Sequence, residues 1–289
     1  MRYLTTKEKP TTSSTSFQYE IADAIYCSDF LIPELQPFFI NETCAKNQSP
    51  PLNPTVNHLF NQLVYKQRIG VGECIYNLEV KSNINGYHLN ADGGHYQILN
   101  HTINTPVKTD ATILLGPALI LNLAMNNVFC FHASACCIND KVFIFLASSG
   151  TGKSTIARFF NEFSNSYRIA DDIIAVKIIN KQLTVLPNFP QLKLNDKQQY
   201  SGEKIKQKTH FLFINKDNRA KTSFTQINHL ESIKKLIAHT VATRLFNPLH
   251  LEKHLVFCHN LLFLCESYQV SYQHRAHSLF ELKELLDEL

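Results

Sequence analysis

Residues 141–163 read KVFIFLASSGTGKSTIARFFNEF, and this stretch decides the fold class. Its first seven residues are almost all apolar, as in a central strand that is covered on both faces. A Gly/Ser-rich turn follows and leads into an amphipathic helical pattern. Strand, glycine-rich turn and helix in this order form the arrangement of a phosphate-binding loop. The stretch therefore predicts an α/β fold with a nucleotide-binding core.

The residues of this turn suit phosphate binding. Gly150 and Gly152 allow the backbone to wrap closely, so that successive N–H groups point at phosphate oxygens, and the start of the helix adds positive charge. Lys153 can reach the β and γ phosphates, and the Ser154 hydroxyl can ligate Mg²⁺. Ala147 stands where the motif usually has its first glycine, and the alternative interpretation is a Gly/Ser turn before an ordinary helix. The predicted nucleotide-binding residues are Ser148, Ser149, Gly150, Thr151, Gly152, Lys153, Ser154 and Thr155.

Two adjacent carboxylates form the second candidate. Asp171 and Asp172 follow a short apolar strand expected at 167–170, 18 residues after Lys153. Open α/β sheets place their ligands at such strand ends. One carboxylate can hold Mg²⁺ while its neighbour takes a proton from an incoming hydroxyl. The residues alone do not say which does which, and the pair could instead be a turn or a helix cap.

His132 is the third candidate, a single histidine in the apolar strand expected at 128–138. Such a histidine is either a core residue with a satisfied hydrogen bond or a group that contacts phosphate, and the pattern alone leaves both open.

Together these elements, FHASA (131–135), SSGTGKST (148–155) and ADDIIAV (170–176), resemble the HPr kinase/phosphorylase superfamily. The nucleotide core of that superfamily is also similar to phosphoenolpyruvate carboxykinase. The resemblance covers about 128–195, and the preceding region looks like the small N-terminal domain of kinase-like relatives. It implies a P-loop kinase core of this type, preceded by a small, mainly β domain. The implied catalytic residues are Asp171 as base, His132 near the transferred phosphate, and Lys153; the implied metal partners are Ser154 and Asp172.

The resemblance implies an ATP- and Mg²⁺-dependent kinase that phosphorylates a Ser/Thr hydroxyl on a peptide or protein. Some relatives phosphorylate a serine on a lasso-type precursor peptide. Thr155 stands where true HPr kinases usually have Glu, and their downstream glycine-rich signature is missing. The resemblance therefore does not extend to HPr as substrate, to a reverse phosphorylase activity or to the family hexamer, although a homo-oligomer is possible. ATP versus GTP preference stays open.

Two other functions remain open. One is a nucleotide-binding accessory protein with little turnover, and the other is a kinase of a small hydroxylated metabolite. A carboxykinase-like enzyme would need a set of substrate arginines that we cannot place. The acceptor would be held by the N-terminal region or the helices of 229–265. Lys193 and Arg244 are possible cationic contacts, or ordinary surface charges.

Composition bounds these functions. The 289 residues are 44% hydrophobic and 18% charged, with a formal net charge of +4, which indicates a globular chain and gives no reason to expect nucleic acid. The eight cysteines include no CxxC pair, and the N-terminal residues resemble no signal peptide, so we expect free thiols and a cytoplasmic protein. The stretch 111–139 has no charged residue, but Asn122, Asn126 and His132 interrupt it. We therefore expect no membrane span.

We expect two domains, 1–110 and 111–289. In the first, residues 1–16 should be frayed and Asn85-Gly86 should turn a hairpin. In the second, strands are expected at 128–138, 141–147, 167–170, 173–180, 182–189, 209–216 and 269–274, and helices at 118–127, from near 153 to 163, at 229–246, from 248 and at 277–289.

Overall fold

A computed structural model of the chain describes residues 14–28, 31, 33–45, 56–60, 76–81, 86–91, 95–100, 115–116, 119–190, 204–216, 221–243, 246, 248–273 and 275–289. The expected boundary between two domains at residue 110 lies outside the described residues. Lys193 and Arg244 also lie outside them.

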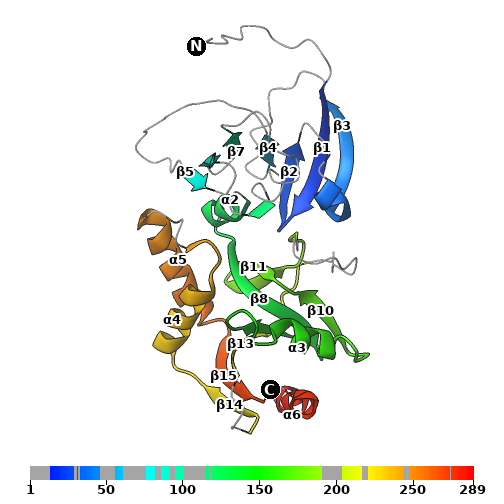
Figure 1. Cartoon of the computed structure of the whole chain (residues 1–289), viewed down its shortest axis with the longest axis vertical. Coiled ribbons are helices and arrows are strands. Elements are labelled where there is room, and N and C mark those ends of the chain that lie inside the picture. The colour runs from blue at the N-terminus through cyan, green and yellow to red at the C-terminus, as the bar shows by residue number, and fades with distance from the viewer. Residues whose placement is uncertain are drawn as a thin grey trace.

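The N-terminal part forms a seven-stranded sheet in the order β3-β1-β2-β4-β7-β6-β5 (Figure 1). β5 and β6 pair antiparallel, which confirms the hairpin expected around Gly86. β1 begins at Ser14, so the expectation of frayed residues up to 16 is wrong at its end. The elements are β1 Ser14–Ile21, β2 Ala24–Ser28, η1 Pro33–Phe38, β3 Phe39–Ala45, β4 Val56–Phe60, β5 Tyr76–Lys81, β6 Gly86–Ala91 and β7 His95–Asn100.

The rest of the chain is a mixed α/β unit around an eight-stranded sheet in the order β12-β11-β8-β9-β13-β15-β14, with β10 paired to β8. β9, β13 and β15 run parallel, whereas β8 is antiparallel to β9, β10 and β11. The strands are β8 Phe129–Ile138, β9 Lys141–Leu146, β10 Ser166–Ala170, β11 Ile173–Ile179, β12 Gln182–Leu186, β13 Thr209–Lys216, β14 Ser223–Gln226 and β15 Glu266–Tyr272.

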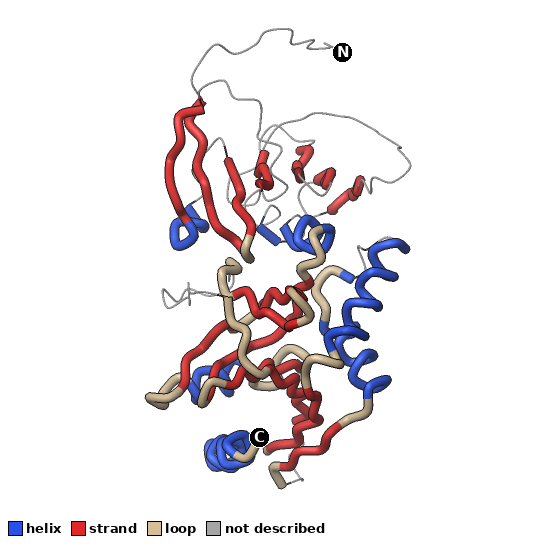
Figure 2. Tube along the Cα trace, turned by 180° about the vertical axis from the view of Figure 1, so that it is seen from behind, coloured by secondary structure: helices blue, strands red, loops and turns tan. Residues whose placement is uncertain are grey.

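Helices cover both faces of this sheet. Figures 1 and 2 show α4 and α5 on one side and α3 and α6 on the other. β9 supplies both cores: Val142, Ile144 and Leu146 join the apolar cluster that includes α4 and α5, while Phe143 and Phe145 join the cluster of α3 and α6. This alternation confirms the expectation of a central, doubly covered strand. The helices are α2 Leu119–Met125, α3 Lys153–Phe160, α4 His229–His239, α5 Pro248–Leu261 and α6 Ala276–Asp287.

Helix α2 connects the two sheets (Figure 1). The Tyr26 hydroxyl of β2 donates a hydrogen bond to Asn122 Oδ1 of α2 at 3.1 Å, and both residues are buried. The Ala22 N–H donates to the Asn188 carbonyl at 2.6 Å. Apolar side chains of β1, β2, α2 and β8 belong to one buried cluster, so the N-terminal sheet packs directly on the mixed α/β unit.

Three expectations need correction. The helix expected over 229–246 ends at His239, because Thr240 turns extended and forms an antiparallel bridge with Phe131. β14 was not expected; it is a short strand at the edge of the sheet with mostly exposed side chains. β15 begins at Glu266, three residues before the strand expected from 269.

Among the described helices, none combines the length and apolar composition needed to cross a membrane. Cys130, Cys136, Cys137, Cys258 and Cys265 are free thiols, as expected, and all of these but Cys265 are buried.

Candidate functional site

The predicted phosphate loop joins the carboxyl end of β9 to the start of α3. β9 ends at Leu146, and α3 begins at Lys153, as the sequence predicts. Gly150 has φ of 79° and Gly152 has φ of 99°, the left-handed region that favours glycine. Gly152 is also the N-cap of α3. The two glycines are therefore required by the backbone path, and the loop leads directly into the N-terminus of a helix.

Lys153 is folded back onto this loop. Its side chain is largely buried, and Nζ donates hydrogen bonds to the carbonyls of Ala147 at 2.7 Å and Ser148 at 3.1 Å. The Thr151 hydroxyl donates to the same Ser148 carbonyl at 2.9 Å, and the Tyr272 hydroxyl donates to the Thr151 carbonyl at 2.9 Å. The ammonium group therefore lies among the carbonyls of the loop, within reach of any anion that the loop holds.

Ser154 connects the loop to the paired aspartates. Its hydroxyl lies 3.4 Å from the main-chain carbonyl oxygen of Asp171 and donates toward it. This contact joins α3 to the segment between β10 and β11. The structure thus brings together the loop and the carboxylates, which are 17 residues apart in the chain.

Asp171 is the inner carboxylate of the pair. Its side chain is 0% exposed and lies 3.3 Å from Arg168 Nη1 and 3.8 Å from Arg158 Nη2. The Ser134 hydroxyl donates to Asp171 Oδ1 at 3.2 Å and to its carbonyl at 3.0 Å. Both carboxylate oxygens are thus engaged, and the two arginines compensate the buried charge.

Asp172 is the outer carboxylate and faces His132. His132 Nε2 lies 3.2 Å from Asp172 Oδ1, and the side chains are 35% and 15% exposed. The backbone explains this pairing: His132 pairs with Ile173 across β8 and β11, and the Ala133 N–H donates to the Asp172 carbonyl at 3.1 Å. His132 is therefore a partly exposed residue beside the aspartate pair, not an enclosed core residue.

Sequence reasoning missed Arg158, Arg168, Ser134 and His239. Arg168 precedes Asp171 by three residues, a spacing that could have suggested the ion pair. Ser134 is inside the FHASA stretch and went unremarked. No feature of the sequence could have indicated that His239 lies beside β8, because its position depends on where α4 ends.

The donor set fits Mg²⁺. Within the described residues, no group of three or more His, Cys, Asp or Glu side chains is arranged around a metal position. Mg²⁺ bound with nucleotides does not need such a group, because it takes one or two protein oxygens and completes its shell with phosphates and waters. The Ser154 hydroxyl and the partly exposed Asp172 carboxylate are hard oxygen donors at the correct end of the loop.

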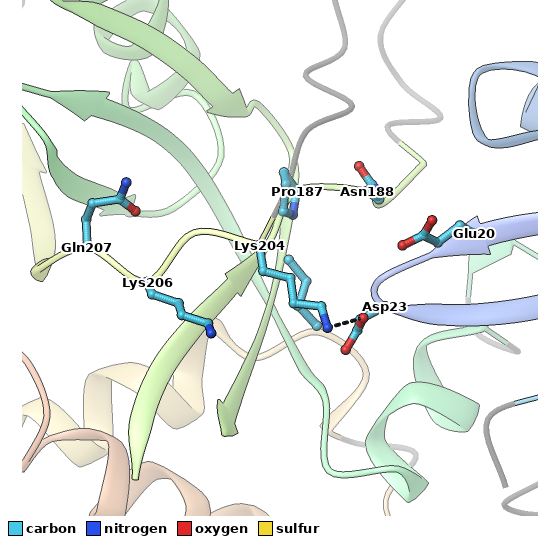
Figure 3. A pocket seen from close by; sticks show the side chains of 8 residues that line it. Glu20, Asp23, Pro187, Asn188, Lys204, Lys206 and Gln207 are labelled. Atoms are coloured by element: carbon cyan, nitrogen blue, oxygen red, sulfur yellow. Dashed lines mark ion pairs between the residues drawn. The ribbon is translucent and has the colours of Figure 1, made fainter. Parts of the chain in front are cut away.

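A cavity of about 720 Å³ lies beside this site, between the β1–β2 turn and the end of β12 (Figure 3). Polar side chains dominate its lining: Glu20, Asp23, Asn188, Lys204, Lys206 and Gln207, together with Leu186 and Pro187. An ion pair between Lys204 Nζ and Asp23 Oδ1, 2.5 Å apart, crosses it.

The strand register places this cavity relative to His132. Leu186 of β12 pairs with Ala175 of β11, and Ile173 of β11 pairs with His132 of β8. The end of β12, which lines the cavity, is therefore two strands from the strand that carries His132. The cavity and the aspartate pair therefore open on neighbouring parts of one sheet.

No protein-family model matches the sequence, and no curated protein matches it. Among solved structures, the chain is similar to the Hpr(Ser) kinase/phosphatase from Coxiella burnetii, with a TM-score of 0.34 and 9% sequence identity. The match covers 55% of this chain and 94% of that chain. A likeness at this level concerns the fold alone, so the assignments below depend on the geometry of the site.

Proposed function

We propose that this protein is a phosphotransferase that binds ATP with Mg²⁺ and transfers the γ-phosphoryl group to an alcohol, a Ser/Thr hydroxyl of a peptide or protein. One observation carries the proposal: the glycine loop with Lys153 and Ser154 lies against the Asp171–Asp172 pair, and Asp172 faces His132. Phosphoryl transfer needs a cationic phosphate cradle, a metal position and a carboxylate beside them.

The loop would hold the nucleotide phosphates. Its backbone N–H groups, from Ser148 to Thr155, and the N-terminus of α3 supply hydrogen-bond donors and positive charge. Lys153 would exchange its two carbonyl partners for phosphate oxygens, which is favourable because a charge-assisted hydrogen bond is stronger than a neutral one. Mg²⁺ would be held by Ser154 and Asp172 and would neutralise charge that develops on the phosphates.

The accessible carboxylate is the better candidate for contact with the reacting groups. To act as base, Asp171 would have to leave Arg168 and Ser134, whereas Asp172 is already partly exposed. We propose that Asp172 also takes the proton of the acceptor hydroxyl and that His132 orients the Asp172 carboxylate. Asp171 would hold the end of β10 in place. The family resemblance gives the base to Asp171. Comparison of the Asp171→Asn and Asp172→Asn variants tests both assignments.

The acceptor would lie toward the cavity of Figure 3. Its polar lining can hydrogen-bond a peptide backbone, and part of that lining is at the end of β12, two strands from the strand that carries His132. Its volume also falls in the range of small-ligand sites, so a small hydroxylated metabolite is the second candidate. Incubation with ATP and either class of acceptor, followed by mass spectrometry for one added phosphate, separates the two. Efficient phosphorylation of metabolites alone would overturn the peptide acceptor and leave the nucleotide site in place.

The nucleotide site has its own test. Lys153→Ala should weaken Mg²⁺–ATP binding by roughly 1.5–3 kcal/mol, the range for a hydrogen bond to a charged group. Isothermal titration calorimetry measures this, with Lys234→Ala, an exposed lysine of α4, as control. Equal ATP affinity of the wild type and the Lys153→Ala protein would refute the phosphate loop.

A further inference from the structure

The end of helix α4 lies on the edge of β8 beside His132. Thr240, the residue after α4, forms an antiparallel bridge with Phe131. In an antiparallel register, the residue before Thr240 lies next to the residue after Phe131. The last residue of α4, His239, is therefore placed beside His132.

The His239 ring also reaches β13. It stacks on Phe213, with ring centroids 6.2 Å apart and an interplanar angle of 28°. Phe213 pairs in parallel register with Leu146, the last residue of β9. Since β9 lies between β8 and β13, a residue that is beside β8 and stacks on β13 lies over the end of β9. The predicted phosphate loop begins at that point.

The groups around His239 are positive. Burial lowers the pKa of His239, and the charges of Lys153, His132 and Lys235 lower it further. His254 of α5 forms a hydrogen bond of 2.9 Å with the hydroxyl of Thr240, the residue after His239. β13 contributes only the uncharged ring of Phe213. The His239 imidazole therefore lies near the cationic Lys153 and Lys235, at a place where an anion would be stabilised.

Lys235, one turn earlier on α4, already has partners. Its Nζ donates to Gln269 Oε1 at 2.8 Å and lies 3.5 Å from Glu231 Oε1. Within the described part of the chain, no hydrogen bond engages the ring nitrogens of His239. Of the two, His239 is thus the side chain of α4 that remains available to a ligand.

We infer that His239 is a second phosphate-binding imidazole, which donates a hydrogen bond to the phosphates of the bound nucleoside triphosphate opposite Lys153. The inference rests on the proposed function, because it needs a triphosphate on the loop. Bound phosphates bring negative charge into a cluster of cations, so the imidazole should take up a proton when the nucleotide binds.

The test compares three variants by isothermal titration calorimetry with Mg²⁺–ATP, each in two buffers of different ionisation enthalpy. His239→Phe keeps a ring on Phe213 and removes the donor, His239→Gln keeps a donor that cannot be protonated, and His277→Gln changes an exposed histidine of α6 as control. His239→Phe should weaken binding roughly tenfold or more. His239→Gln should recover part of the affinity, and both should lose the proton uptake that the wild type and the control show.

The outcomes separate this inference from the proposed function. ATP affinity and proton uptake unchanged in both His239 variants would overturn the inference, while loss of binding in Lys153→Ala would keep the nucleotide site. No ATP binding by the wild type would overturn both. If His239→Phe does not fold, unchanged proton uptake by His239→Gln is enough to overturn the inference.

Discussion

Asp171 and Asp172 are neighbours in the chain with opposite surroundings. Both lie in the bend between β10 and β11. Asp171 points inward, where Arg168 and Ser134 engage it, and Asp172 points toward His132 at the open edge. One carboxylate is therefore enclosed beside Arg168 and Ser134, and the other is 15% exposed beside His132.

Substitution by asparagine should separate these roles. Asp171→Asn leaves Arg168, which is 9% exposed, without its counter-charge, so the free energy of unfolding should fall by roughly 3 kcal/mol. Asp172→Asn should change stability by less than about 0.5 kcal/mol and abolish phosphoryl transfer. Urea denaturation and a turnover assay measure the two effects. A stable but inactive Asp171→Asn protein, with Asp172→Asn active, would return the base to Asp171.

At the scale of elements, α4 shows how its two ends are set by different means. Its N-cap is Asn228, whose Oδ1 accepts a hydrogen bond from the Glu231 N–H at 2.9 Å, a local signal. It ends where the Thr240 hydroxyl donates to the Leu236 carbonyl and the Thr240 backbone joins β8. The second contact is tertiary, and it places His239 over the end of β9.

Removing the N-cap should therefore affect stability without affecting the nucleotide site. Asn228→Ala should lower the free energy of unfolding by about 1 kcal/mol, because the Glu231 N–H loses its partner. Asn228→Asp, which keeps an acceptor oxygen, is the control, and urea denaturation is the measurement. Identical unfolding midpoints for Asn228→Ala and the wild type would show that the cap contributes nothing.

For the whole molecule, stability should depend on buried histidines. His210 lies near the start of β13, stacked on Phe143 with centroids 5.2 Å apart, and its Nδ1 lies 3.3 Å from Glu266 Oε2 without a hydrogen bond. Burial, followed by the charge of Lys208, lowers its pKa to about 4. Burial likewise lowers the pKa of His254 to about 4. Both side chains must be neutral in the folded protein.

The sign of the pH effect follows from these lowered pKa values. The unfolded chain binds the proton first, at the ordinary histidine pKa of about 6.5. Stability should therefore be constant above about pH 7 and should fall as the pH decreases from 6.5 to 4, by roughly 3 kcal/mol for His210. His210→Phe should remove that part of the loss and keep the part from His254. Urea denaturation at pH 8, 6 and 4.5 measures it, and parallel losses in variant and wild type would contradict the assignment.

Much of this fold follows from local sequence. The apolar run of β9, the glycines with positive φ at 150 and 152, and the turns at Asn139-Asp140 and Asn180-Lys181, which also have positive φ, are signals of a few residues. The hairpins and the strand, loop and helix around Lys153 could therefore be predicted. Asp172 was a candidate because it follows a recognisable strand, and His132 because it is a single histidine within one.

What the sequence by itself determined is thus the α/β class, the glycine loop and a short set of candidate polar residues, since periodicity and turn chemistry act over a few neighbouring residues. Only the tertiary structure decided which candidates meet and what state they are in. It buried Asp171 between two arginines, opened Asp172 to His132, and ended α4 so that His239 lies beside the loop. These results depend on pairing between strands and helices far apart in the chain, and no local pattern encodes that pairing.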